Sequence, residues 1–180
     1  MKKHRGFVAS YLLTAIALIV IVTSGVTFMQ QDLSRNQVIF DSSKLIQSQI
    51  STIHTVLTNC ALLYPMGDNG SGFHKSYPAT GALASRDCPG STFSNQNLWT
   101  GRDGMVLPAM KFGYSNWKYV NDATGVFVTT TWANEAALEK SAANLVNKYA
   151  SGQLEYMFIL EPLPRIPARS GILKYWIIKE

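Results

Sequence analysis

The feature that most constrains the fold is an uncharged apolar run near the N-terminus, FVASYLLTAIALIVIVTSGVTFM, which occupies residues 7–29. A helix of about 20 such residues spans the hydrocarbon core of a bilayer. Lys2, Lys3 and Arg5 precede the run, and flanking basic residues favour the cytoplasmic side of a membrane. The sequence therefore predicts a membrane-spanning helix with a cytoplasmic N-terminus.

A cleaved secretory signal is the alternative explanation of this run. The apolar core of such a signal holds about 7–15 residues, so the run of residues 7–29 is longer than a signal requires. Thr23, Ser24 and Gly25 offer only a mediocre small-residue cleavage site. We therefore favour an uncleaved span, which places the chain after roughly residue 30 outside the cytoplasm.

The helix is expected to continue beyond the membrane, because no Pro or Gly occurs from Val26 to Tyr64. Five apolar residues recur along this segment at helical spacing: Ile39, Ile46, Ile50, Ile53 and Leu57. Such spacing places them on one stripe of a helix. We predict a single helix over residues 7–62, roughly 80 Å long. Its first half, residues 7–29, is apolar all round and its second half is amphipathic.

Residues 63–180 predict a globular head outside the cytoplasm. Turn-forming residues dominate residues 66–114, which predicts a long irregular region. The expected elements after it are a hairpin of residues 116–120 and 126–132, a helix over residues 134–152, and strands over residues 154–160 and 172–179. We expect an α+β fold, in which the amphipathic half of the long helix packs on a mostly antiparallel sheet of about four strands with one short helix.

The chain has two cysteines, Cys60 and Cys88. A compartment outside the cytoplasm permits disulfides, so we predict one bridge between them. It would close a loop of about 29 residues, worth roughly 3–4 kcal/mol in the chain-entropy model. Two free buried thiols are the alternative. A bridge would attach the long irregular region to the end of the helix, which is a structural role.

Neither catalysis nor nucleic-acid binding is predicted. The isoelectric point is near 9.2, but the basic residues after the leader are scattered singly, so no phosphate-tracking surface is expected. The sequence lacks HExxH, GxSxG, CxxC and Gly-rich phosphate-loop motifs. His54, Cys60, His74 and Cys88 form an alternative zinc set, but their spacing matches no familiar zinc pattern. We therefore predict no enzyme, no cofactor and no metal.

A basic leader, Gly6-Phe7, an uninterrupted helix and a disulfide-bearing α+β head together resemble the type IV pilin family, including minor pilins and the pseudopilins of type II secretion. The resemblance implies that a prepilin peptidase cuts between Gly6 and Phe7 and methylates the new N-terminus, so residues 1–6 are a leader. The implied partners are the membrane, the peptidase and other pilin-like subunits, which meet through the N-terminal helix. The implied location is the bacterial inner membrane with a periplasmic head, and a cell-surface filament after assembly.

One position departs from the family pattern. The family usually has glutamate at the fifth position after the cut, which pairs with the N-terminus of a neighbouring subunit; here that position is Tyr11. An unpaired carboxylate is costly in lipid. Tyr11 carries no charge, so it avoids this cost, but it also cannot form the charge pair with the N-terminus of a neighbouring subunit. The sequence thus favours a minor or tip-type subunit of a type IV pilus or type II secretion-like filament. The alternative is a single-pass membrane-anchored envelope protein whose periplasmic head is a binding module; a secreted enzyme has no supporting residues.

Overall fold

The computed structural model describes residues 5–82, 87–91, 109–133, 136–161 and 168–180. Within these ranges, the side chains of residues 5–11, 25–29, 31, 82, 159–161 and 168–169 are outside the description. The chain divides into two compact units, residues 1–38 and residues 39–180.

One helix, α1 (Arg5–Leu63), begins in the first unit and ends in the second. Its C-terminal end lies within a residue of the predicted one. Tyr64 N still donates to Cys60 O at 3.0 Å, and Pro65 then stops the helix because proline has no N–H to continue it. The continuous helix predicted between the apolar run and the head is confirmed.

The membrane-spanning half was expected over residues 7–29. Over the part of the chain whose side chains are described, no helix has an apolar segment long enough to cross a membrane. The side chains at both ends of the expected span, residues 7–11 and 25–29, lie outside that part.

The second unit contains an antiparallel sheet in the order β1-β2-β3-β5-β4. The strands are β1 (Gly81–Ala82), β2 (Lys118–Asp122), β3 (Gly125–Ala133), β4 (Leu154–Glu161) and β5 (Ala168–Lys179). The β2–β3 hairpin has a tight turn, because Asp122 Oδ1 accepts hydrogen bonds from Thr124 N at 2.8 Å and Thr124 Oγ1 at 2.6 Å. The predicted α+β fold with an antiparallel sheet is confirmed.

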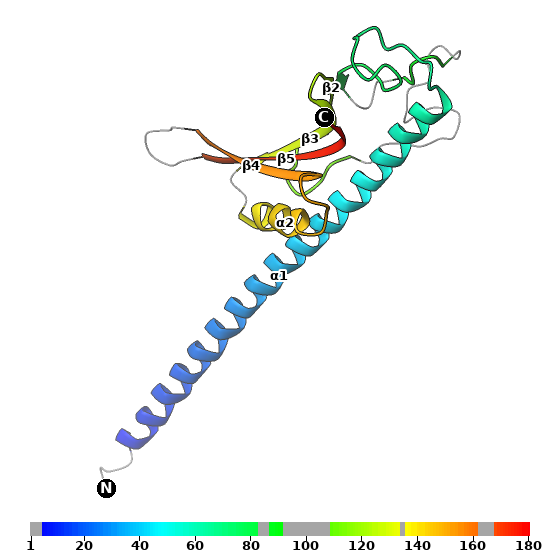
Figure 1. The fold of residues 1–180 in the computed structure, drawn as a ribbon. Helices are drawn as coiled ribbons and strands as arrows, with labels where there is room; N and C mark the ends of the chain where they lie inside the picture. Colours follow the sequence, from blue (N-terminus) through cyan, green and yellow to red (C-terminus); the bar gives the residue numbers. More distant parts are fainter. Residues whose placement is uncertain (1–4, 83–86, 92–108, 134–135, 162–167) are drawn as a thin grey trace. The chain divides into compact units, whose positions relative to one another are not determined.

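Both helices of the second unit's described residues cover the same face of the sheet: α1 from Ile39 onward and α2 (Ala136–Val146) (Figure 1). The core takes one buried stripe from α1, formed by Ile46, Ile50, Ile53 and Leu57, each at most 1% exposed. Alternate residues of β3 and β5, such as Val128 and Leu173, point into the same core. The amphipathic half of the long helix therefore covers the sheet, as the sequence predicts.

On the opposite face of the sheet, a cation–π arrangement covers two aromatic rings. Lys174 Nζ lies 3.6 Å from the ring centroids of both Phe127 and Trp176. Burial lowers the pKa of Lys174, and the carboxylates of Glu155 and Asp122 partly oppose that shift. The aliphatic stem and charge of this lysine thus shield two aromatic rings that none of the described helices covers.

Several elements differ from prediction, and strand β2 begins and ends two residues later than the predicted strand of residues 116–120. Residues 81–82 form the short edge strand β1 inside the region expected to be irregular; Thr80 Oγ1 aligns it by accepting from Asn121 N at 2.8 Å. Strand β5 begins at Ala168 rather than residue 172, because the β4–β5 ladder extends to the Glu161–Ala168 pair.

Helix α2 ends at Val146, before the expected stop at Gly152. The expected cap of α2, Asn134, lies outside the described residues.

Gly171 is required by the packing of β5 against β3. It pairs with Trp132, and a Cβ at this position would overlap the buried Trp132 indole. Gly171→Ala is therefore expected to lower the free energy of unfolding by about 1–3 kcal/mol, as overpacking does in cores. Urea unfolding followed by tryptophan fluorescence measures the change. Ser170→Ala, one residue away, should stay within about 0.5 kcal/mol; equal effects of the two variants would contradict the steric argument.

Candidate functional site

Apolar side chains surround α1 over residues 12–22. Those described are 49–68% exposed: Leu12, Leu13, Ile16, Leu18, Ile19, Val20, Ile21 and Val22. Five consecutive residues, 18–22, belong to this set, and five consecutive helical positions point to every side of a helix. Contiguous exposed apolar surface of this kind is typical of interaction regions.

The hydroxyl groups that follow this apolar surface bond back to their own helix. Thr23 Oγ1 donates to Ile19 O and Ser24 Oγ donates to Val20 O, each at 2.8 Å. Such bonds satisfy a hydroxyl without water. This stretch of α1 therefore suits an apolar environment in spite of its two polar residues.

The residues singled out for processing and for subunit packing lie at the start of α1. Gly6, Phe7 and Tyr11 are helical in backbone. Their side chains are outside the described residues, so the predicted cut and the Tyr11 packing position remain predictions from the sequence.

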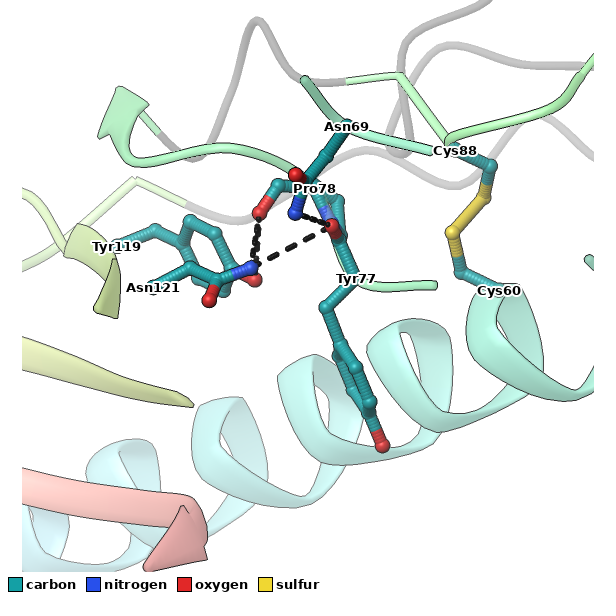
Figure 2. Close-up of a disulfide and its surroundings, with 7 residues drawn as sticks. All are labelled: Cys60, Asn69, Tyr77, Pro78, Cys88, Tyr119 and Asn121. Carbon is teal, nitrogen blue, oxygen red and sulfur yellow. Dashed lines mark hydrogen bonds between the residues drawn. A yellow bond between two sulfur atoms is a disulfide. The ribbon is translucent and has the colours of Figure 1, made fainter. Parts of the chain in front are cut away.

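The predicted disulfide between Cys60 and Cys88 is confirmed (Figure 2). The two Cα atoms are 5.6 Å apart, in the usual range for bridged cysteines. Cys60 is 2% exposed, at the last turn of α1. Because each sulfur is bonded to the other, the alternatives of free thiols and of a zinc site with thiolate ligands are wrong.

The segment between the two cysteines is held to strand β2 by a hydrogen-bond network that the sequence did not reveal. Asn121 Nδ2 donates to Pro78 O at 2.9 Å and Tyr119 OH donates to the same oxygen at 3.0 Å (Figure 2). Asn69 Nδ2 donates to Tyr77 O at 2.7 Å. The segment is therefore joined to α1 by the disulfide and to β2 by the hydrogen bonds at Pro78.

Gly67 adds a close backbone contact beside the disulfide. A Cβ at Gly67 would overlap the carbonyl group of Pro89, so only glycine allows the two segments to approach so closely. Together with the bridge, this contact fixes the described residues around Cys88 against the end of α1. The arrangement serves structure, which agrees with the role expected for the cysteines.

A cleft of about 280 Å³ opens beside the second half of α1. Its lining residues are Gln47, Ile50, Ser51, His54, Thr55, Lys148, Tyr149 and Tyr175. The helix contributes the first five at positions three and four apart, which share one side of α1. Lys148 and Tyr149 come from the segment that follows α2, and Tyr175 comes from strand β5. From the sequence, His54 stood out only as a member of the alternative zinc set, and no cleft was predicted, because the three elements are distant in the chain.

The aromatic rings at the floor of the cleft form a connected group. The His54 and Tyr175 rings meet edge to face at 6.1 Å between centroids, and those of Tyr149 and Tyr175 do so at 5.7 Å. Gln153 Nε2 donates to Tyr175 OH at 3.1 Å. Burial raises the pKa of both Tyr149 and Tyr175, so both phenols are protonated at neutral pH and can donate hydrogen bonds.

Comparison with known proteins adds nothing to this geometry, since no protein family, curated protein or solved structure matches the chain. The functional conclusion therefore depends on the order of features in the sequence and on the geometry described above.

Proposed function

We propose that this chain is a minor or tip-type structural subunit of a type IV pilus or type II secretion-like filament, processed by prepilin peptidase between Gly6 and Phe7. The observation that carries the proposal is the combination in α1 of an apolar surface on every side and, later in the same helix, a buried stripe that belongs to the head core. In this proposal the first half anchors the subunit in the inner membrane, and the head lies in the periplasm.

A helix that is apolar all round is suited to two environments. Lipid tails and a bundle of identical helices are equally apolar, so transfer between them changes little hydrophobic free energy. The exposed residues from Leu12 to Val22 have this character. An assembly machine could therefore move the helix from the membrane into a filament core at small cost in hydrophobic free energy.

Tyr11 favours a minor or tip position over the shaft. A shaft subunit must align with many copies of itself, and the usual glutamate supplies a charge pair that sets this register. A subunit present in one or a few copies needs that pairing less. Tyr11 also favours the second candidate function, a single-pass envelope protein whose periplasmic head binds a partner and whose leader is never removed.

Filament incorporation separates the two candidates. In bacteria with an active prepilin peptidase and filament machine, the wild-type chain should appear in the sheared filament fraction and Gly6→Leu should remain in the membrane fraction. Ser10→Ala, which leaves the proposed cut intact, is the matched control and should behave as wild type. A wild-type chain that stays in the membrane fraction as fully as Gly6→Leu would refute the filament proposal and leave the anchored binding module.

A further inference from the structure

We propose that the cleft between α1, the end of α2 and β5 binds a monosaccharide-sized sugar acid, with Lys148 and His54 receiving the carboxylate. This inference is independent of the proposed filament role, since every lining residue belongs to the second unit.

The size of the cleft limits the ligand to about one sugar ring. Ligand sites in proteins usually hold about 300–1,000 Å³, and this cleft, at about 280 Å³, lies at the lower limit. Its lining is mainly polar, which differs from a site for an apolar molecule. The ligand should therefore be small and rich in hydrogen-bonding groups.

The charge of the lining favours an anion. Lys148 and His54 are its basic residues, and no Asp or Glu is among the described residues that line it. The backbone N–H of Lys148 donates to Leu145 O at 2.9 Å, and that of Tyr149 donates to Val146 O at 3.3 Å. These bonds satisfy two carbonyls at the end of α2 and fix the backbone that carries the two side chains.

The type of donor favours a carboxylate over a phosphate. Phosphate sites commonly use Arg forks or the N–H groups of a helix N-terminus. The described lining contains no Arg. One ammonium and one imidazole match the two oxygens of a carboxylate.

The remaining side chains match the rest of a sugar. The hydroxyls of Ser51, Thr55 and Tyr149 and the amide of Gln47 can donate to and accept from sugar hydroxyls. The half-buried Tyr149 ring supplies apolar surface for the C–H face of a pyranose ring. No feature of the cleft calls for a longer chain, so a hexuronate such as glucuronate is the simplest ligand of this class.

Histidine NMR tests the proposal at the site itself, because the chain has only three histidines. The full chain, labelled with ¹³Cε1-histidine in a zwitterionic detergent, is titrated with sodium glucuronate against matched sodium chloride. The His54 signal, assigned with His54→Gln, should shift saturably, whereas those of His4 and His74 should not. Glucose should bind at least about tenfold more weakly, since it lacks the charge-assisted hydrogen bonds.

Two lysine variants test the assigned contact. Lys148→Met should weaken glucuronate binding about tenfold or more, while Lys140→Met, an exposed control on α2, should leave it unchanged. Circular dichroism confirms that both variants are folded. The proposal is overturned if His54 shows no saturable shift, if all three histidines shift together, if glucose binds as well as glucuronate, or if the two lysine variants behave alike.

Discussion

Replacing Cys60 and Cys88 together by serine is expected to lower the free energy of unfolding by about 3–4 kcal/mol. The bridge joins residues 28 apart in the chain, and loss of that crosslink gives the unfolded chain more conformational freedom. The double substitution avoids leaving a single free thiol. Urea unfolding of the full chain in detergent, followed by tryptophan fluorescence, reports on the head because Trp117, Trp132 and Trp176 are all buried there.

Reduction of the wild-type chain provides an independent control for this prediction. Reduced wild type and the double serine variant should unfold at the same urea concentration, since both lack the crosslink. Ser91→Ala, at a half-buried position close to Cys88, should cause a far smaller change. A loss below about 1 kcal/mol in the double variant would mean that the hydrogen bonds to β2 hold this segment without the bridge.

Ile53→Ala is expected to lower the free energy of unfolding by about 2–5 kcal/mol. The Ile53 side chain is 0% exposed and belongs to the core between α1 and the sheet. Truncation removes three carbons from that core and leaves a cavity that the rigid helix closes only in part. The same urea experiment measures the change.

The matched control is Leu62→Ala, on the same helix but 72% exposed. It should change the free energy of unfolding by no more than about 0.5 kcal/mol. Comparable losses at the two positions would show that α1 gains its stability within the helix instead of from packing on the sheet.

The parts of the fold that the sequence predicted depend on local periodicity. The spacing of Ile46, Ile50, Ile53 and Leu57 needs only the geometry of one helix, and all four are buried. The β2–β3 hairpin was likewise predictable, because its turn residues are adjacent in the chain. The disulfide followed from compartment and cysteine count, with only one pairing available.

The parts that were missed depend on contacts between distant segments. Asn121 bonds to Pro78 O across 43 positions of sequence, and no local pattern around either residue indicates this. The cleft requires Ser51, Lys148 and Tyr175 to meet, which only the packed fold achieves. The predicted strand ended at residue 120, so nothing in the sequence marked Asn121, a 3% exposed residue of β2, as a buried polar group that needs hydrogen-bond partners.

The central claim, removal of the leader before Phe7, is tested most directly by the intact mass and N-terminal sequence of the native chain isolated from the bacterial envelope. The account predicts a chain that begins with N-methylated Phe7 and lacks residues 1–6. A chain that keeps Met1 in cells with an active prepilin peptidase, or one that begins near Val26 after ordinary signal cleavage, would contradict it.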